Sequence, residues 1–408
     1  MMQFKNIFVF RLNSRRKILP NILLVSLLSQ FFIYYYNVFN GMYPDVAWLV
    51  VLANLCMILG YVFGSKFNIK LNSHKKIVCE KYKFEYNYSL IRRIAIAFIF
   101  TGLLAHVYFY SNNIYSNYAD SYTVSRGQGF ITVFFNFLLV GMILLETLSI
   151  YNQNSRKIRI LNRFLMLIYS LVYFFIFLKR RQIIILLLAI IALRRDTLNK
   201  KFFMWVACAL VILLFTIYGK LRGYITVYGF ENIWNVFLSD FSIEWIQFEN
   251  FEGKYISRTL DDVYNYVNTN GIDPSVMYGI LCCFIPRAFF EDNNKPVAFP
   301  EWYTMHFFPN DYARGTGYAG SIIAELYLIG WLPLVICVFF AFGYLFSKLE
   351  KFSDNRTHIL KNIIYAISIY NIIVLPRYDF ASIIIDLVFL YLPIILVFKK
   401  ATMRKVIC

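Results

Sequence analysis

Long apolar runs recur from one end of the chain to the other, and they limit the possible folds more than any other feature. A helix needs roughly 20 apolar residues to cross a bilayer, where the backbone must satisfy its own hydrogen bonds. Of the 408 residues, 59% are hydrophobic and 16% are charged, and soluble domains carry more charge than this. The pattern predicts an all-α polytopic membrane protein in which residues 1–408 form a single integral membrane domain.

About ten transmembrane helices are predicted from these runs. Their approximate bounds are 18–37, 44–64, 91–110, 130–150, 161–178, 182–194, 202–219, 317–346, 360–375 and 381–398. The first run has no small-residue cleavage site, so we interpret it as a retained span. The main alternative joins 164–193 into a single kinked span. It would place the basic segment RRDTLNKK outside, and we therefore reject it.

The distribution of charge predicts the orientation. Most of the 41 lysines and arginines lie on one side of the predicted spans, and most acidic residues lie on the other. Because basic residues accumulate in cytoplasmic loops, both termini are predicted to be cytoplasmic. The net charge of +18 then serves mainly to anchor the chain at the anionic inner leaflet. We therefore predict membrane lipids as partners and no nucleic acid.

One apolar run, FFIFLKRRQIIILLLAII at 174–191, is interrupted by Lys179, Arg180 and Arg181. Burying a charge in hydrocarbon costs about 2.5–3.5 kcal/mol per residue even on a lenient insertion scale. The hairpin is short for two crossings, so its basic turn is predicted to lie in a dip below the outer surface. Two interpretations stay open: the cations extend to lipid headgroups, or they form a cationic pocket for an anionic headgroup.

Residues 220–316 form a large hydrophilic loop that is predicted to be periplasmic. Within it, 232–251 carries apolar residues at helical spacing and is predicted to lie along the membrane. The apolar stretch 275–290 is too short to cross and is predicted to be re-entrant or interfacial. The rest, 291–317, is rich in Pro, Asn, Asp and aromatic residues and is predicted to be irregular.

Arginines recur on the predicted outer face of the membrane. They are Arg180, Arg181, Arg222, Arg287, Arg314 and Arg377, from separate outer segments. A guanidinium group suits phosphate because its planar fork donates bidentate hydrogen bonds and keeps its charge. Each arginine alone is explained by snorkelling or by pairing within a loop. Together they predict a site for an anionic group such as a pyrophosphate.

Three carboxylates are predicted within the spans: Glu146 near the inner end of its span, and Glu325 and Asp386 in the outer parts of theirs. A carboxylate at such depth needs a partner, and the outer arginines are the natural ones. A structural ion pair and a catalytic role both stay open for Glu325. The seven cysteines and four histidines have no metal-ligand spacing, so no metal and no cofactor are predicted.

At this point the chain resembles the bacterial O-antigen polymerase family, often called Wzy. The resemblance covers the order of the spans and several motifs: the basic turn in KRRQIIILLL, the arginine in GKLRGY, the segment IPRAFFEDNNKP, and the glutamate in GYAGSIIAELYLIGW. One departure is that ELYLIGW lacks the Asn-Phe-Gly of some relatives.

The resemblance implies an oligosaccharide repeat unit polymerase of the inner membrane with a GT-C-like helical fold. Such an enzyme transfers a glycan from undecaprenyl pyrophosphate onto a new lipid-linked repeat unit at the periplasmic face, without a metal. Its partners would be the undecaprenyl-pyrophosphate-linked oligosaccharide and a chain-length regulator.

For this reaction the leaving pyrophosphate needs cations and the acceptor hydroxyl needs a base. The predicted cations are Arg180, Arg181, Arg287 and Arg377, followed by Arg222, Arg314 and Lys295. The predicted bases are Glu325, His306 and Asp311, with Glu325 preferred because a helix holds it.

Two other functions remain open. An O-antigen ligase would use the same donor with a different acceptor. A lipid-linked oligosaccharide flippase or transporter is the candidate that is not an enzyme, and it would be expected to show repeated halves with broken helices. The sequence has no matching halves.

Overall fold

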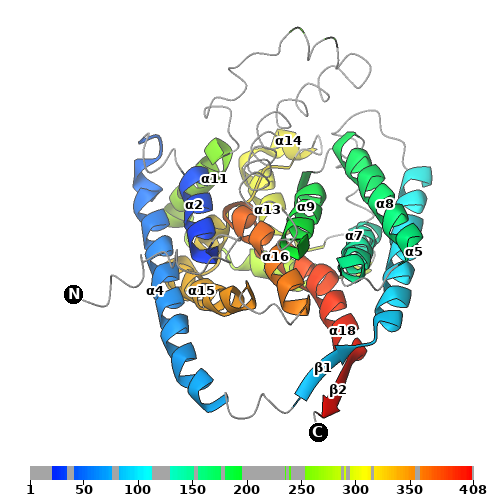
Figure 1. The fold of residues 1–408 in the computed structure, drawn as a ribbon. Helices are drawn as coiled ribbons and strands as arrows, with labels where there is room; N and C mark the ends of the chain where they lie inside the picture. The colour runs from blue at the N-terminus through cyan, green and yellow to red at the C-terminus, as the bar shows by residue number, and fades with distance from the viewer. Residues whose placement is uncertain are drawn as a thin grey trace.

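The computed structural model describes residues 21–34, 41–75, 82–112, 129–150, 155–175, 180–194, 253–285, 289–290, 295–313, 317–353 and 359–406, together with the single residues 235 and 239. In this part of the chain the fold is almost entirely helical, as predicted (Figure 1). The helices are α2 (Ile22–Ile33), α4 (Pro44–Lys75), α5 (Tyr88–Asn112), α7 (Gly129–Ile150), α8 (Arg156–Phe175), α9 (Arg180–Arg194), α11 (Gly253–Asn270), α12 (Ser275–Leu281), α13 (Phe299–Phe307), α14 (Pro309–Ala313), α15 (Ile322–Ser353), α16 (Ile359–Val374), α17 (Phe380–Asp386) and α18 (Leu392–Ala401).

Five helical segments in the described part of the chain are long and apolar enough to cross a membrane: Pro44–Ser65, Tyr88–Ser111, Val133–Ile150, Ile322–Glu350 and Phe380–Ala401. Two shorter apolar helices span Ile22–Ile33 and Arg181–Ile191. The chain is therefore a multi-pass membrane protein. Each predicted span that falls within the described residues overlaps a helix, and the seventh, 202–219, lies outside them. The total of ten spans stays a prediction.

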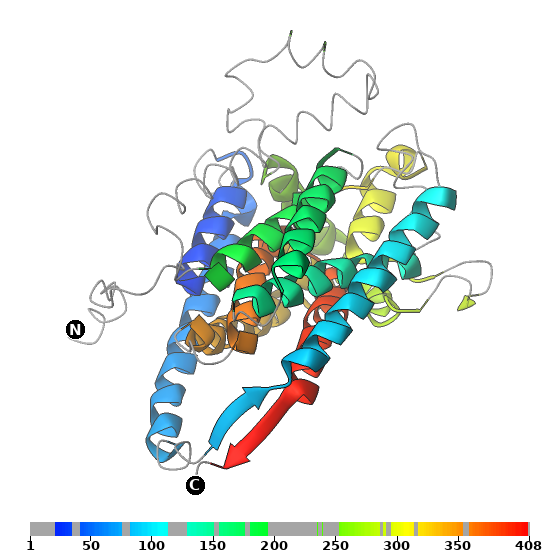
Figure 2. The same ribbon diagram turned by 45° about the vertical axis from the view of Figure 1, so that its right-hand side comes forward.

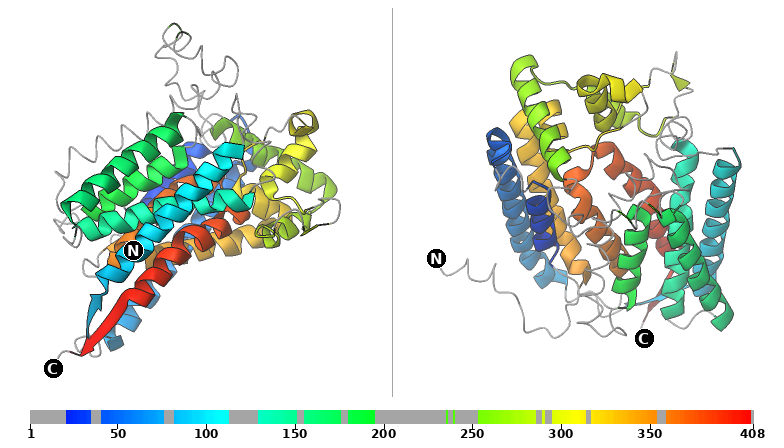
Figure 3. Two further views of the ribbon diagram at one scale, coloured as in Figure 1. Left: turned by 90° about the vertical axis from the view of Figure 1, so that its right-hand side faces the viewer. Right: turned by 90° about the horizontal axis from the view of Figure 1, so that it is seen from above.

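The helices form two packed groups with α16 between them (Figure 3, right). One group contains α5, α7, α8, α9 and α18, and the other contains α2, α4, α11, α13 and α15. Helix α16 contributes Ile363 and Ile367 to the first group and Tyr365 and Ile369 to the second. Because α16 has buried residues on both of its faces, it packs against both groups.

Helices α4 and α15 approach each other closely at two glycines. A Cβ added at Gly60 would overlap the carbonyl oxygen of Phe340, and one added at Gly343 would overlap that of Met57. Small residues allow such backbone contact, which drives association where lipid removes the hydrophobic effect between helices. Helices α4 and α15 are therefore tightly packed against each other within the second group.

Helix α15 is bent near its first third. Trp331 has φ 55° and ψ −155°, and Pro333 follows two residues later. The bend separates the Leu328 carbonyl from the helix ladder, and the backbone N–H of Asp273 donates to it at 2.9 Å. The segment after α11 thus satisfies a backbone acceptor that the bend exposes.

A small antiparallel sheet corrects the prediction of an all-α fold. Strand β1 (Tyr82–Tyr86) pairs with β2 (Thr402–Val406), with Phe84 opposite Arg404. Figure 2 shows the two strands continuing α5 and α18 at one end of the molecule. Because the partners are far apart in the sequence, no turn signal joins them, and a pairing of this kind leaves no local pattern to detect.

The predicted irregular structure at 291–317 is also wrong in part, because this segment contains α13 and α14. Pro300 lies in the first turn of α13, where a proline is tolerated, and Phe299, Trp302 and Tyr303 are buried on one face. Their helical spacing was the missed signal. Helix α12 has seven residues, about 10 Å of helix, and is too short to cross. The predicted helix at 232–251 lies outside the described residues apart from 235 and 239.

Candidate active site

The turn between α16 and α17, Leu375–Phe380, has the sequence LPRYDF and is held from several sides. It begins with the 3₁₀-helical turn Leu375–Arg377. The hydroxyl of Tyr34 in α2 donates to the carbonyl of Pro376 at 3.2 Å. The Asp379 carboxylate caps α17 by accepting from the backbone N–H of Ser382 at 3.4 Å. These contacts place the turn at the junction of the two helix groups.

Arg181, in the first turn of α9, forms an ion pair with Asp386 at the end of α17. The Nη2 group of Arg181 donates to Oδ1 of Asp386, and the hydroxyl of Tyr378 donates to Oδ2 at 3.2 Å. The guanidinium carbon lies 5.6 Å from the centre of the Tyr378 ring. The Asp386 side chain is 1% exposed, whereas 32% of the Arg181 side chain remains exposed. The pair therefore has one closed end and one accessible end.

Further polar side chains extend this contact into the bundle. The Tyr378 hydroxyl is 3.4 Å from Oδ1 of Asn371, whose amide donates to the Tyr391 hydroxyl at 3.2 Å. Tyr391 in turn donates to the hydroxyl of Ser368 at 3.2 Å. Polar groups buried among helices are costly unless they are paired. This arrangement satisfies them by joining the turn to the interior face of α16.

Glu325, in the first turn of α15, is fully buried. Its Oε2 accepts a hydrogen bond from the backbone N–H of Phe380 at 2.8 Å. Its Oε1 is buried and has no hydrogen-bond partner among the described residues. The sequence predicted an arginine as the partner of this carboxylate. That prediction is wrong for the described residues, because the partner is the backbone amide of Phe380. One oxygen accepts a hydrogen bond, and the other is buried without a described partner.

Lys295 lies in the segment before α13, and its Nζ donates to the carbonyl of Cys283 at 3.3 Å. Burial raises the pKa of the Cys283 thiol, with the positive charge of Lys295 opposing the shift and the negative charge of Asp379 adding to it. Burial also raises the pKa of Asp379, against its hydrogen bonds with Ser382 and the charge of Arg181. The described contact of Lys295 is therefore with Cys283, and its part in an anion site stays a prediction.

The other two predicted bases belong to a separate polar cluster. Nδ1 of His306 lies 3.1 Å from the Trp302 carbonyl, and the indole of Trp302 donates to Asp273 at 2.9 Å. The carboxylate of Asp311 accepts from the Tyr318 hydroxyl at 2.8 Å. Within the described part of the chain, no contact joins His306 or Asp311 to Arg181. Their neighbours favour a structural role in α13 and α14.

Several predicted cations cannot be placed. Arg222, Arg287 and Arg314 lie outside the described residues. Arg180 begins α9, but its side chain is not among those described. Arg377 is half-buried in the LPRYDF turn. Of the six predicted arginines, Arg181 has a described contact with this site and Arg377 lies in the turn itself, and the convergence of the six stays a prediction.

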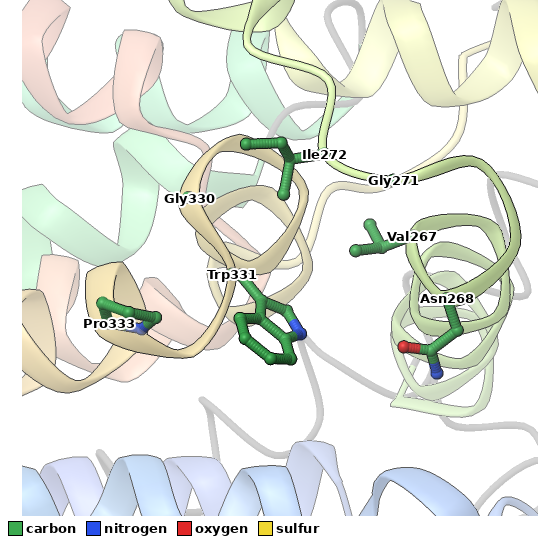
Figure 4. A pocket seen from close by; sticks show the side chains of 7 residues that line it. All are labelled: Val267, Asn268, Gly271, Ile272, Gly330, Trp331 and Pro333. Atoms are coloured by element: carbon green, nitrogen blue, oxygen red, sulfur yellow. The ribbon is translucent and has the colours of Figure 1, made fainter.

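A pocket of about 470 Å³ lies away from these charges, between the end of α11 and the bend of α15 (Figure 4). Its walls are largely apolar: Val267, Asn268, Gly271, Ile272, Gly330, Trp331 and Pro333. The Trp331 indole donates to the Tyr327 hydroxyl at 2.7 Å, and that hydroxyl donates to Asn268 at 3.2 Å. None of the predicted site residues lines this pocket, so we place the candidate site at the LPRYDF turn instead.

Sequence reasoning missed Tyr378, Asp379 and Asn371. The motif LPRYDF was selected for its arginine, and the two polar residues after that arginine were the available signal. Among the described residues, no group of three or more His, Cys, Asp or Glu side chains is arranged to hold a metal ion. The described site is therefore built from an ion pair, two further carboxylates and tyrosine hydroxyls.

Comparison with known proteins gives one match. The family model described as O-antigen polysaccharide polymerase Wzy matches residues 19–405, which is nearly the whole chain. No curated protein and no solved structure matches the chain. The match covers both helix groups and every element of the candidate site.

Proposed function

The chain belongs to the O-antigen polysaccharide polymerase Wzy family and acts in O-antigen polymerisation, and on this premise we propose its detailed reaction. The enzyme transfers a glycan from undecaprenyl pyrophosphate onto a lipid-linked repeat unit at the periplasmic face of the bacterial inner membrane. It is a glycosyltransferase that works without a metal, with both termini in the cytoplasm. The observation that carries the proposal is the family match over residues 19–405.

Arg181 provides the charge that the leaving pyrophosphate needs. Breaking the anomeric C–O bond places negative charge on the diphosphate, and preoriented donors in a low-dielectric site stabilise such charge strongly. The partly exposed Arg181 side chain supports this role. Lys295 and Arg377 lie on the segments around the same turn and add positive charge. Arg180, Arg222, Arg287 and Arg314 complete the proposed set.

Glu325 accepts the proton of the acceptor hydroxyl as that hydroxyl attacks the anomeric carbon. Its Oε2 is fixed by the Phe380 amide, which leaves Oε1 as the acceptor atom. A carboxylate held at one oxygen keeps its direction, and a fixed direction is what general base catalysis requires. His306 and Asp311 lack this connection to the LPRYDF turn in the described structure, and we rank them below Glu325.

The test uses a deletion strain complemented with variants of the full chain. Arg181→Ala is expected to abolish long chains and to leave lipopolysaccharide capped with one repeat unit, at an unchanged amount of protein in the membrane. Arg181→Lys is expected to restore activity in part, because lysine keeps the charge but not the planar fork. A normal ladder of chain lengths from Arg181→Ala would overturn the proposed site.

The same gels separate the competing functions. Loss of a ligase leaves uncapped lipid A core, whereas loss of a polymerase leaves core with a single repeat. Loss of a transporter strands repeat units at the cytoplasmic face, where they are inaccessible to periplasmic enzymes. Uncapped core from the deletion strain, with lipid-linked polymer accumulating, would replace the polymerase reaction with that of a ligase.

A further inference from the structure

The contact between Arg181 and Asp386 has a role beyond holding two helices together. Asp386 uses both carboxylate oxygens, one for Arg181 and one for Tyr378. It is almost completely buried, at 1% exposure. Because both oxygens of Asp386 already accept hydrogen bonds, this carboxylate is less suited than Glu325 to accept a proton from a substrate hydroxyl. Its remaining effect on the reaction is through the group that it binds.

The contact with Asp386 engages only part of the Arg181 guanidinium group. A guanidinium group has five N–H donors, and the described contact with Asp386 uses Nη2. Its Nε is buried and has no partner among the described residues, while 32% of the side chain is exposed. Asp386 therefore holds one terminal nitrogen of the Arg181 guanidinium group, and the other N–H donors can bind a ligand.

The carboxylate is held by Tyr378, and a row of polar side chains lies beside that tyrosine. Tyr378 donates to Asp386 and lies under the guanidinium group. Tyr391 donates to Ser368, and Ser368 donates to the Ile364 carbonyl in α16 at 2.8 Å. Asn371 donates to the Tyr391 hydroxyl, and its Oδ1 lies 3.4 Å from the Tyr378 hydroxyl. Such a shell locks the rotamers of a site so that its donors need no reorganisation during the reaction.

We infer that Asp386 and Tyr378 are positioning residues that aim Arg181 at the departing diphosphate. This inference rests on the proposed function and deepens it, because it assigns a role to two residues that the family match leaves unassigned. The diphosphate binds the donors of Arg181 that Asp386 leaves open. Asp386 stays outside the reaction, and the hydroxyl of Tyr378 keeps the carboxylate in its orientation.

A structural ion pair predicts a different result from a charge swap. In the double variant Arg181→Asp/Asp386→Arg the two charges still attract each other, but the cation moves from α9 to α17 and is no longer available to the diphosphate. The positioning role predicts that the swap accumulates in the membrane yet forms no long chains. Recovery of a normal ladder by the swap would show that only the pair matters and would overturn the inference.

The chain contains a matched control. Arg258, Asp262 and Tyr303 form a second arginine–aspartate–tyrosine cluster, with Arg258 Nε 3.6 Å from the Asp262 carboxylate and the Tyr303 hydroxyl 2.6 Å from it. This cluster lies on α11 and α13 and has no described contact with the LPRYDF turn. Asp262→Asn is expected to keep the ladder, whereas Asp386→Asn is expected to lose it. Equal ladders from both variants would contradict a special role for Asp386.

Kinetics give a readout that a structural role would not move. With full-length enzyme in phosphatidylethanolamine–phosphatidylglycerol liposomes and lipid-linked repeat unit as substrate, Tyr378→Phe removes one hydroxyl and keeps the ring. We expect kcat to fall about 10–100-fold with little change in KM, as for other misplaced catalytic groups. Unchanged kcat at normal protein stability would overturn the inference, and this variant decides the question if Asp386→Asn fails to fold.

The two levels of proposal fail separately. If Arg181→Ala keeps the ladder, the pyrophosphate site is misplaced and the proposed function loses its main residue. If Arg181→Ala loses the ladder while Asp386→Asn and Tyr378→Phe keep full kcat, the site stands and only the positioning role is rejected.

Discussion

The carboxylate of Glu325 accepts the backbone N–H of Phe380 at a distance of 2.8 Å. This bond joins the first turn of α15 to the first residue of α17, across 55 positions of the sequence. It anchors the LPRYDF turn through its last residue. The same side chain is thus a structural anchor through one oxygen and, in our proposal, a base through the other.

Two substitutions at Glu325 separate these roles. Glu325→Gln keeps a carbonyl oxygen that can accept from Phe380 but removes the base, so we expect an intact protein that forms no long chains. Glu325→Ala leaves the Phe380 amide without its partner, at a cost of about 1–3 kcal/mol for a buried donor, and we expect a lower Tm as well. Thermal unfolding in detergent and lipopolysaccharide gels measure the two effects. Full polymerisation by Glu325→Gln would restrict Glu325 to the structural role.

The positions of the five long apolar helices followed from the sequence because an apolar run of the right length has few alternatives in a membrane. The partners of the buried charges did not follow in the same way. Asp386 was predicted to meet an arginine and it does, but Glu325 meets a backbone amide instead. Which partner a carboxylate finds depends on how α9, α15 and α17 pack, and composition carries no information on that packing.

The missed elements have a related cause. Strand β1 pairs with β2 where α5 and α18 meet, although these elements are far apart in the sequence. Helix α13 was not predicted because Pro300 and the aromatic residues around it are as typical of irregular surface segments as of buried helix faces. Tyr378 was overlooked because a tyrosine in a turn is usually an interfacial residue, and its hydrogen bond to Asp386, eight residues later, depends on how the turn folds back along α17.

The close approach of α4 and α15 predicts a strong effect of small substitutions. Gly343→Val adds atoms where the Met57 carbonyl already lies, and overpacking of this kind costs about 1–3 kcal/mol or more. We expect a clear fall in Tm and less protein in the membrane. Gly317→Ala is the control, because an added Cβ at Gly317 meets nothing within 4 Å. If both variants show the wild-type Tm, the two helices do not pack as described.

The lowered pKa of Asp273 predicts that its contribution to the free energy of unfolding depends on pH. Burial raises the pKa of its carboxyl, but hydrogen bonds from Ser275 and Trp302 outweigh burial, so the pKa lies below its ordinary value. A lowered pKa in the folded state means that the contribution is present above the unfolded pKa of about 3.9 and is lost as the pH falls through the folded pKa.

Trp302→Phe tests this contribution, because it removes the indole N–H that donates to Asp273. We expect a loss of about 0.5–1.5 kcal/mol at neutral pH and a smaller loss near pH 3. The measurement is the difference in Tm between wild type and variant at the two pH values. A difference that is constant with pH would mean that the charge of Asp273 does not matter and that only the packing of the ring does.

The bend in α15 predicts an unusual order of stability at Trp331. Its φ of 55° with ψ of −155° is a conformation that glycine adopts freely and that costs other residues about 1–3 kcal/mol. In an ordinary helix, glycine is about 1 kcal/mol worse than alanine. Here we expect Trp331→Gly to be more stable than Trp331→Ala, since both lose the indole contact with Tyr327 and only glycine relieves the backbone. Tm values of the two variants in the same detergent decide the point: the opposite order, with alanine above glycine by the usual helix margin, would mean that α15 continues through this position as a regular helix.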